Sequence, residues 1–436
     1  MKCGVLVGSA VTLHGSAQQM VDRLRPPLQA DLDFHDKSSS YGPHAIHAFA
    51  AKFPPQLPNF FIRKLTEPGQ VVLDPMCGSG TTLVEAVSLE RQGIGVDIDP
   101  LAILQSRVKT IPFDPKSVEI AVNEVVSEAM NLILDKNFLL EEISRRFDPP
   151  TQNFIDYWFL KKTQLELVAL LTAIDMKNED LRPFLQIVLS SIIMTKSGGV
   201  SMARDLAHSR PHIDKDKKPR SAISTFLAKG AKSARSMGYL SRNSPSAKVF
   251  LGDARKLPLR NDSVDLVVTS PPYANAIDYA RAHKFSLIWL GHSIDTIAHL
   301  RPKYIGAERI HSRPSELPDE VEQVLLEISK RDEKKEAIIR QYFGDMQKTL
   351  VEIYRVLSGE RVAIVVVGPS TVRGECVPTP QCLAAIGRQH GFEVAGLAVR
   401  KLDRDRRMLP ASNIANDNGI ELRMHEETVI GFVKRG

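Results

Sequence analysis

The spacing of hydrophobic residues predicts an alternation of strands and helices in the first quarter of the chain. Apolar residues 71–73 form a strand-like run that ends at Asp74, and residues 81–89 carry apolar positions at helical spacing. Residues 93–96 form a second strand-like run that ends at Asp97. A strand, a glycine-rich turn, a helix and a second strand make a right-handed βαβ unit, which opens a doubly wound sheet.

This alternation stops after residue 112 and resumes after residue 245. Between them the pattern is mostly helical, with apolar residues at helical spacing in 118–135, 153–174 and 181–194. Further strands are predicted at 248–252, 264–269 and 361–367, and a final hairpin at 392–399 and 428–433. The pattern therefore predicts an α/β fold: a mostly parallel, doubly wound sheet with a C-terminal antiparallel hairpin and large helical insertions.

The predicted elements divide the chain into four parts. Residues 1–40 are expected to be a loosely attached N-terminal arm, and residues 41–112 and 246–436 together form the sheet domain. Residues 113–245 are a helical and basic insertion between those two blocks. Residues 299–345 are a smaller helical insertion within the second block.

Composition and charge narrow the setting. The 436 residues are 43% hydrophobic and 25% charged, which is ordinary for a globular protein, and the net charge of +6 with a pI near 9.0 favours a polyanionic partner. Cys3, Cys77, Cys376 and Cys382 are too sparse for a disulfide framework and form no metal-binding pattern. We expect a cytoplasmic protein without signal peptide, membrane span or metal.

Chemistry concentrates first at the turn after the first strand, Asp74-Pro75-Met76-Cys77-Gly78-Ser79-Gly80-Thr81. Glycines there let the backbone approach a ligand, but no lysine follows them, so the turn is no phosphate-binding P-loop. An acid at the strand end instead suits a cationic or amino-acid-like ligand. Asp97 could accept both hydroxyls of a ribose, and Asp253, after the third strand, could accept from an adenine amino group. Asp99 is expected to cap the helix that starts at Pro100.

A second turn, Thr269-Ser270-Pro271-Pro272-Tyr273, follows the strand at 264–268. An exocyclic amine on a base is a poor nucleophile because its lone pair is delocalised into the ring. The Ser270 hydroxyl and the Pro271 carbonyl could hold the amine hydrogens out of that plane, and the two prolines keep the turn rigid. Tyr273 could stack on a flipped base.

The two turns together resemble the motifs of the S-adenosylmethionine-dependent DNA amino-methyltransferases, and a serine before Pro-Pro-Tyr resembles the cytosine-N4 type. The resemblance implies a Rossmann-like class I methyltransferase fold and S-adenosyl-L-methionine as cofactor. Lys52-Phe53-Pro54-Pro55-Gln56 resembles an upstream motif whose Phe packs on that cofactor. The implied catalytic residues are Ser270, Pro271, Pro272 and Tyr273. The implied cofactor site comprises Phe53, Asp74, Pro75, Cys77, Gly78, Gly80, Thr81, Asp97, Ile98, Asp253 and Ala254.

Double-stranded DNA is the expected partner, and basic residues indicate where it could bind. From Lys196 to Arg260 there are 15 Lys or Arg and four Asp or Glu, an excess of 11. Phosphate contacts could explain this run, although a solvated basic face could as well. The candidate DNA-binding residues are Arg204, His208, Arg210, Lys215, Lys217, Lys218 and Arg220, and, in the loop before the last strand, Arg404, Arg406 and Arg407. Residues 113–245 are the candidate target-recognition region.

Three other functions remain open at this point: adenine-N6 methylation of DNA, guanine-N2 methylation of RNA, and nucleic-acid binding without turnover. A cytosine-C5 enzyme is disfavoured because it needs a nucleophilic cysteine, typically in a Pro-Cys pair, and no cysteine follows a proline here. The expected setting is a bacterial or archaeal, nucleoid-associated enzyme, monomeric or homodimeric, with a restriction endonuclease as a further partner.

Overall fold

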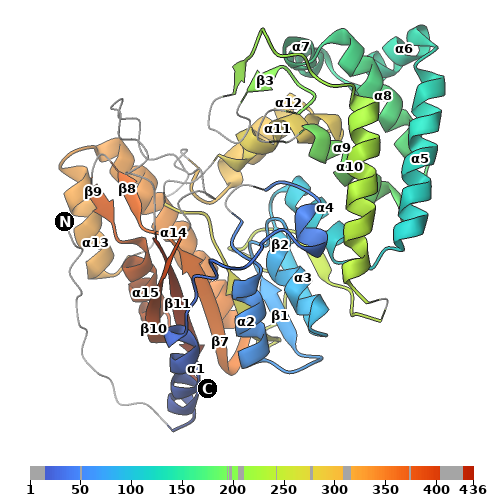
Figure 1. The fold of residues 1–436 in the computed structure, drawn as a ribbon. Helices are drawn as coiled ribbons and strands as arrows, with labels where there is room; N and C mark the ends of the chain where they lie inside the picture. The colour runs from blue at the N-terminus through green and yellow to red at the C-terminus, as the bar shows by residue number, and fades with distance from the viewer. Residues whose placement is uncertain are drawn as a thin grey trace.

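A seven-stranded sheet forms the centre of the molecule, in the order β10-β11-β7-β6-β1-β2-β5 (Figure 1). The computed structural model describes residues 15–49, 52–193, 195, 199–204, 211–241, 243–274, 278–307, 316–372, 375–402 and 426–436. The strands of the sheet are β1 (Val71–Asp74), β2 (Gln92–Asp97), β5 (Lys248–Leu251), β6 (Val264–Thr269), β7 (Leu357–Val367), β10 (Phe392–Lys401) and β11 (Glu426–Lys434).

The pairing of these strands identifies the fold. All neighbours from β5 to β7 are parallel, whereas β11 lies antiparallel to both β7 and β10. A doubly wound sheet with one antiparallel strand inserted between its last two parallel strands is the Rossmann-like class I methyltransferase arrangement. The predicted fold class and C-terminal hairpin are confirmed.

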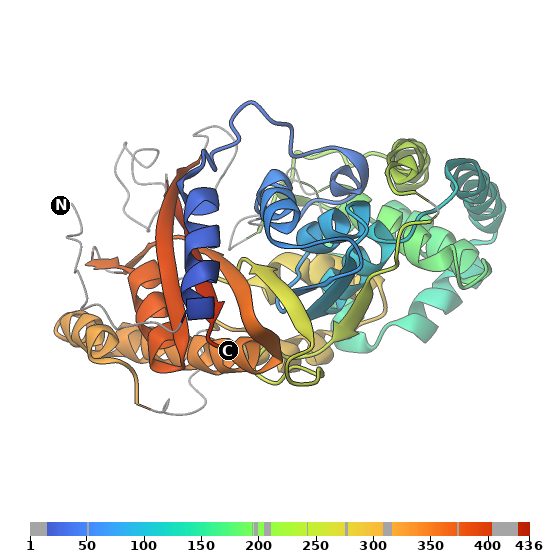
Figure 2. The same cartoon turned by 90° about the horizontal axis from the view of Figure 1, so that it is seen from below.

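Helices cover both faces of the sheet (Figure 2). One face is covered by α1 (Gly15–Gln29), α2 (Gln56–Leu65), α3 (Thr81–Ser88) and α4 (Pro100–Lys109). The other face is covered by α13 (Asp319–Ser329), α14 (Glu333–Val356) and α15 (Thr379–Gln389). The remaining short elements are β3 (Ala203–Arg204), β4 (His212–Ile213), β8 (Ser370–Val372), β9 (Glu375–Val377) and the 3₁₀ turns η1 (Gly42–Ala45), η2 (Met237–Tyr239) and η3 (Arg301–Lys303).

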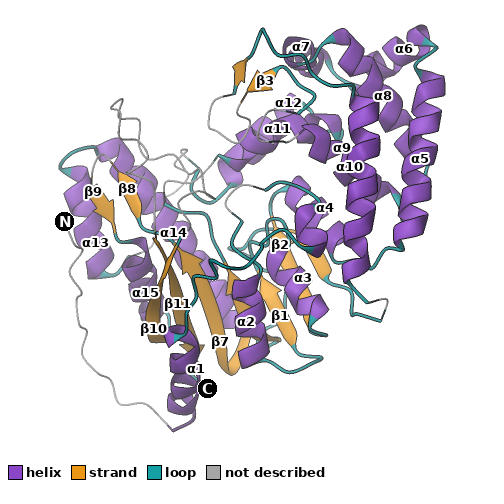
Figure 3. Ribbon diagram, in the orientation of Figure 1, coloured by secondary structure: helices purple, strands orange, loops and turns teal. Residues whose placement is uncertain are grey.

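A second hydrophobic core lies in a helical unit beside the sheet, where Figure 3 shows helices gathered together. This unit contains α5 (Pro115–Leu132), α6 (Lys136–Arg146), α7 (Pro149–Trp158), α8 (Lys161–Asp175), α9 (Arg182–Ile193) and α10 (Ala222–Ser236). Aspartates begin three of these helices, because Asp114, Asp135 and Asp148 each accept a backbone N–H of the first turn. The helical character expected for the insertion agrees with the structure.

Packing extends the helical unit beyond residue 245. Helices α11 (Tyr279–Trp289) and α12 (Ile294–Leu300) follow strand β6 in sequence, yet Phe285, Trp289 and Ile297 belong to the core of the helical unit. Leu101 and Val108 of α4 join the same core and connect it to the sheet domain. The expected boundary at residue 245 therefore misses these two helices, because a boundary read along the chain cannot show a segment that returns to an earlier core.

Two further expectations about the domains need correction. The segment expected to be a loose arm contains α1, whose Leu24 and Leu28 are buried against the sheet. A Cβ built on Gly431 of β11 would lie 2.8 Å from each of these leucines, so no side chain fits at that position. The smaller insertion expected at 299–345 is not separate, since Phe343 and Met346 of α14 pack on the sheet core. Charged residues of both signs occur along α14, so the sequence alone did not reveal that one face of this helix is buried.

Some predicted positions lie outside the described residues. These are His208, Arg210, Arg404, Arg406 and Arg407. Within the described ranges, no helix is both long enough and apolar enough to cross a membrane. In those same ranges, no group of three or more His, Cys, Asp or Glu residues is placed to hold a metal ion.

Candidate active site

The glycine turn after β1 has the backbone that its sequence requires. Gly78 and Gly80 adopt left-handed conformations, with φ of +47° and +78°. A Cβ built on Gly80 would lie 2.8 Å from Ser106 Oγ and 2.9 Å from Ser106 Cα, so any side chain there would collide with α4. Helix α3 begins directly after this turn, at Thr81. The turn thus brings backbone close to whatever occupies the edge of the sheet.

Asp97, at the end of β2, holds the turn in place. Its two carboxylate oxygens accept hydrogen bonds from the backbone N–H groups of Gly78, at 2.8 Å, and Asp99, at 2.9 Å. Burial, and next the neighbouring Asp99 carboxylate, raise the pKa of Asp97 to about 7. The carboxylate therefore combines a fixed position with an unusually high affinity for a proton.

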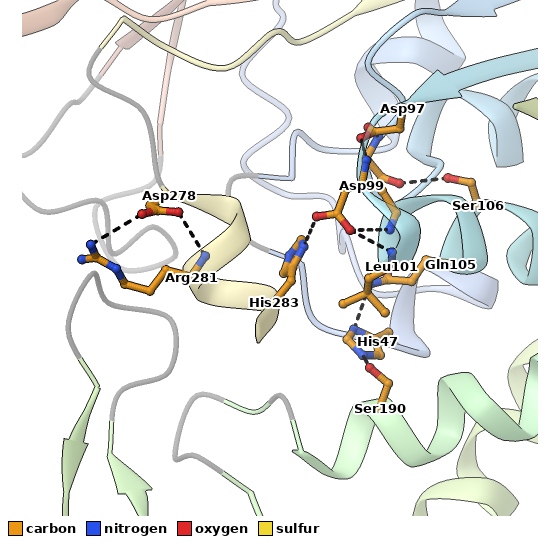
Figure 4. Close-up of polar contacts among 12 residues, drawn as sticks. His47, Asp97, Asp99, Leu101, Gln105, Ser106, Ser190, Asp278, Arg281 and His283 are labelled. Carbon is orange, nitrogen blue, oxygen red and sulfur yellow. Dashed lines mark hydrogen bonds and ion pairs between the residues drawn. The ribbon is translucent and has the colours of Figure 1, made fainter. Parts of the chain in front are cut away.

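Asp99 caps α4, as expected, and also reaches the helical unit. One oxygen accepts the N–H of Leu101 at 2.8 Å, and the other contacts Nδ1 of the fully buried His283 on α11 (Figure 4). Although burial acts in the opposite direction, the interaction with His283 keeps the pKa of Asp99 below its ordinary value. The pair fixes α11 against the end of β2. In the same view His47 lies between Gln105 of α4 and Ser190 of α9.

Asp74, at the end of β1, has a different place from the one expected. Its side chain is buried and does not line the pocket at the sheet edge; its Oδ1 accepts a 2.7 Å hydrogen bond from the Thr269 hydroxyl of β6. Burial raises the pKa of Asp74 to about 6. The acid expected to face a cationic ligand instead connects the glycine turn to the strand that carries the second turn.

Asp253 follows β5 and is held by a neighbouring arginine. Arg255 donates to both of its carboxylate oxygens, at 2.9 Å and 2.7 Å, and also forms an ion pair with the buried Asp345 at 2.9 Å. The hydrogen bonds from Arg255 outweigh burial and lower the pKa of Asp253. Oδ1 also accepts the backbone N–H of Arg255 at 2.9 Å, so Oδ2 is the oxygen with more capacity to accept from a ligand.

A pocket opens at the carboxyl ends of these strands. The space between its walls amounts to about 790 Å³, a figure that includes the part open to solvent. Of the expected site residues, it brings together Phe53, Pro75, Cys77, Gly78, Thr81, Asp97, Ile98, Asp253, Ala254, Ser270 and Pro272. Asp74, Gly80, Pro271 and Tyr273 are not in its wall.

The pocket wall also contains residues that the sequence did not single out. Phe49 stacks on Tyr279 of α11, with ring centroids 5.8 Å apart, and both rings line the pocket. Lys52 places a cation in the wall while it donates to the His44 carbonyl, and burial lowers its pKa to about 8. Lys52 belongs to the motif around Phe53, although it was not among the expected site residues, and Phe49 lies four residues before Phe53. Tyr279 gave no such signal, because its helix is distant in sequence.

The second turn lies at the end of β6, beside the glycine turn. Ser270 is half-buried and lines the pocket, and its hydroxyl makes no hydrogen bond to any part of the chain that the structure describes. Pro271 is buried. The hydroxyl of Tyr273 donates a 2.6 Å hydrogen bond to Glu427 of β11, and the ring packs against the sheet core. Tyr273 is thus tied to a residue that the sequence did not indicate.

The basic segment is partly engaged within the protein. Arg204 of β3 forms an ion pair with Asp214 at 2.9 Å, and Lys217 donates to the Ala203 carbonyl at 2.9 Å. Lys215, Lys218 and Arg220 are exposed. Among the described candidate DNA-binding residues, these three are exposed and have no ion pair with another described residue.

The pocket suits the cofactor that the sequence motifs implied. S-adenosylmethionine carries a carboxylate, an ammonium group, a ribose and an adenine. The wall offers a cation in Lys52, acids in Asp97 and Asp253, and aromatic or apolar surface in Phe53 and Ile98. A Cβ built on Gly78 would lie 3.0 Å from the ring of Phe49, so the glycine lets this aromatic ring pack against the turn in the pocket wall.

Comparisons with known proteins agree with this geometry. A family model described as DNA methylase matches residues 29–107, which span the Phe53 motif, the glycine turn and Asp97. The chain is 24% identical to the Type II methyltransferase M.MvaI of Kocuria varians, over 92% of this chain and 93% of that protein. It is 25% identical to the Type II methyltransferase M.MjaII of Methanocaldococcus jannaschii, over 61% of this chain and 66% of that protein.

Solved structures with a similar fold include an S-adenosylmethionine-dependent methyltransferase from Methanosarcina mazei. It is 10% identical, with a TM-score of 0.32 over 86% of this chain and 97% of that chain. A TehB-like methyltransferase from Corynebacterium glutamicum is also 10% identical, with a TM-score of 0.29 over 96% of this chain and 98% of that chain. TM-scores this low do not identify a fold, so the fold assignment rests on the strand order of the sheet. The matching family model, the two relatives and the strand order together support an S-adenosylmethionine-dependent DNA methyltransferase.

Proposed function

We propose that this DNA methyltransferase transfers a methyl group to the N4 amino group of cytosine in duplex DNA. The observation that carries the proposal is the side chain of Ser270, which stands in the pocket wall with its hydroxyl unengaged by the described residues. A hydroxyl in that position is able to accept a hydrogen from an exocyclic amine. Serine at the first position of the turn favours cytosine over adenine.

The second turn acts by positioning the amine. The Ser270 hydroxyl and the Pro271 carbonyl accept its two hydrogens, which localises the nitrogen lone pair toward the pocket. Pro271 and Pro272 have no N–H and fixed φ angles, so the acceptors keep their geometry. Tyr273 stacks on the flipped base. Direct displacement needs no covalent intermediate with the protein, and alignment supplies much of the rate.

The first turn and the strand ends hold the cofactor, which supplies a methyl group activated by its positive sulfonium. Asp97 accepts from the ribose hydroxyls and Asp253 from the adenine amino group. Phe53 packs against the cofactor, while Pro75, Cys77, Gly78, Thr81, Ile98 and Ala254 shape the wall. Asp74 and Gly80 act indirectly, since both are buried beneath the turn. We assign to Lys52, a cation in the pocket wall, an ion pair with the carboxylate of S-adenosylmethionine.

The helical unit and the basic segment are proposed to bind DNA. Lys215, Lys218 and Arg220 are exposed, so they can neutralise phosphates without first breaking a buried contact. We assign target recognition to residues 113–245 together with α11 and α12, which share one core. As the matched relatives are Type II methyltransferases, we further propose that the protein protects DNA against a restriction endonuclease of the same specificity.

The identity of the labelled base tests the proposal. Plasmid DNA is incubated with the purified protein and cofactor carrying a tritiated methyl group, then digested to nucleosides and separated. We expect the label in N4-methylcytosine. Label in N6-methyladenine would replace the cytosine assignment with adenine. In a parallel reaction with RNA, label in guanine together with no label in the plasmid would overturn DNA as the substrate. Ser270→Ala is the matched variant, with cofactor binding by calorimetry as its control.

A further inference from the structure

A chain of hydrogen-bonded groups connects the second turn to a buried ion pair between the last two strands of the sheet. The Tyr273 hydroxyl donates to Glu427 Oε1 at 2.6 Å, and Arg400 Nη1 donates to Glu427 Oε2 at 2.6 Å. The side chains of Arg400 and Glu427 are 3% and 1% exposed. Removing two charges from water is unfavourable unless their geometry and remaining hydrogen bonds compensate, so this pair needs a reason.

The position of the carboxylate is fixed from several directions. Arg400 and Glu427 lie directly opposite one another in the β10–β11 pair. Arg400 also donates from Nε to the Leu32 carbonyl at 2.9 Å and from Nη2 to the Asp33 carbonyl at 3.2 Å. The guanidinium is therefore held by backbone as well as by the carboxylate, and the carboxylate cannot move without breaking several bonds.

We propose that Glu427 is a positioning residue for the reaction: it fixes the ring of Tyr273 in the orientation that stacks on the target base. A tyrosine ring has two rotatable bonds, and apolar contacts along one side restrain it only loosely. A hydrogen bond from its hydroxyl to an ionised acceptor is stronger than a neutral one and defines the ring from its far end. A ring that is already ordered loses little conformational entropy when the base arrives.

This proposal rests on the proposed function, because it takes Tyr273 to be the stacking residue. It differs from a purely structural role in its consequence. If Glu427 acts through Tyr273, removing the hydroxyl makes Glu427 irrelevant to the rate of methyl transfer, although Glu427 still stabilises the hairpin through Arg400. If the pair is only structural, the Tyr273 hydroxyl has no effect on the rate.

Tyr273→Phe, Glu427→Gln and the double variant test this in full-length protein. Single-turnover methylation of plasmid DNA is measured with tritiated cofactor, at saturating DNA and cofactor. We expect each single variant to react roughly 3- to 10-fold more slowly than the wild-type protein. Because contacting residues are coupled, the rate of the double variant should lie within about twofold of the rate of the slower single variant. The Kd for cofactor, measured by calorimetry, should be unchanged.

Tyr342→Phe is the matched control, since it removes a buried hydroxyl of α14 that has no hydrogen-bond partner among the described residues. It should leave the rate unchanged. Independent, multiplying losses in the double variant, or a normal rate for Tyr273→Phe, would overturn the proposal. If Glu427→Gln does not fold, the comparison of Tyr273→Phe with Tyr342→Phe decides. A wild-type protein that methylates no DNA would instead overturn the proposed function.

Discussion

The two turns that form the site are supported in different ways. The glycine turn is held by residues near in sequence: Asp97 binds the backbone of Gly78, 19 positions away, and of Asp99, two positions away. The second turn is held by residues far away, because Thr269 is bonded to Asp74 across 195 positions and Tyr273 to Glu427 across 154. The carboxylate contacts of the glycine turn thus come from residues nearby in sequence, whereas the contacts of the second turn form only when distant strands of the sheet have assembled.

This difference predicts that damage to the glycine turn stays on the cofactor side. Asp97→Ala removes the acceptor of two backbone N–H groups and of the proposed ribose contacts. Losing the two proposed ribose hydrogen bonds to a charged group, each about 1.5–3 kcal/mol, weakens cofactor binding by roughly 100-fold or more. Calorimetry with S-adenosylmethionine measures the loss, and DNA binding in a filter assay should stay within about twofold. If the variant lost affinity for the cofactor and for DNA equally, the proposed separation between the two turns would be wrong.

The reverse experiment is made at the second turn. Tyr273→Ala should lower single-turnover methylation by roughly 10- to 100-fold, since base–aromatic stacking contributes about 1–3 kcal/mol. Cofactor affinity should remain normal because the ring is not part of the pocket wall. A near-normal rate would show that Tyr273 does not stack on the base.

Thr269→Val probes the long-range connection itself. The substitution keeps the shape and removes the donor to Asp74, leaving a buried carboxylate less satisfied. We expect the free energy of unfolding at pH 8 to fall by about 1–3 kcal/mol. Thr349→Val is the matched control, since that buried hydroxyl donates only to the Asp345 carbonyl of its own helix. Chemical denaturation measures the free energy of unfolding of both variants. Equal losses in the two variants would show that the hydrogen bond between β1 and β6 has no special contribution to stability.

A pH titration sharpens the description of the cofactor side. The pKa of Asp97 is about 7 in the folded protein, above its ordinary value of 3.8, so the free protein loses stability as pH rises from about 4 through 7. Cofactor affinity should change in the opposite direction, rising about tenfold from pH 6 to pH 8, because the ionised carboxylate is the better acceptor for the ribose hydroxyls. In Asp97→Asn both dependences should be weaker. A flat wild-type profile would contradict the assignment.

The smallest effect is expected outside both turns. Lys218→Gln and Arg220→Gln should each weaken DNA binding a few-fold and reduce the slope of log affinity against log salt by about one. Lys116→Gln, at an exposed position of α5, is the control for a lost surface charge. If all three variants behave alike, the basic segment is a solvated face and does not contact DNA.

The same difference explains what the sequence could predict. The βαβ unit and the cap at Asp99 follow from residues within about 50 positions of one another, and the structure has both. The same part of the sequence brings Asp97 and Phe53 into the pocket wall. The supporting roles of Asp74 and Glu427 do not, because they depend on which strands become neighbours. Nor does the hydrophobic pattern show that α1 is buried: two prolines interrupt that helix, and its partners are the last strands.

The central place of β1 also sets the order in which the molecule can form during its synthesis. A ribosome that adds about 5–20 residues per second needs roughly 10–40 s to make the 195 residues that separate Asp74 from Thr269. Until β5 is made, late in that interval, β1 and β2 have only each other to pair with among the strands of the sheet. Helices α5 to α10 emerge in the meantime with most of their shared core already present. Most of the proposed DNA-reading part, all but α11 and α12, is therefore made before the catalytic turn, and the carboxylate of Glu427 is made near the end of synthesis.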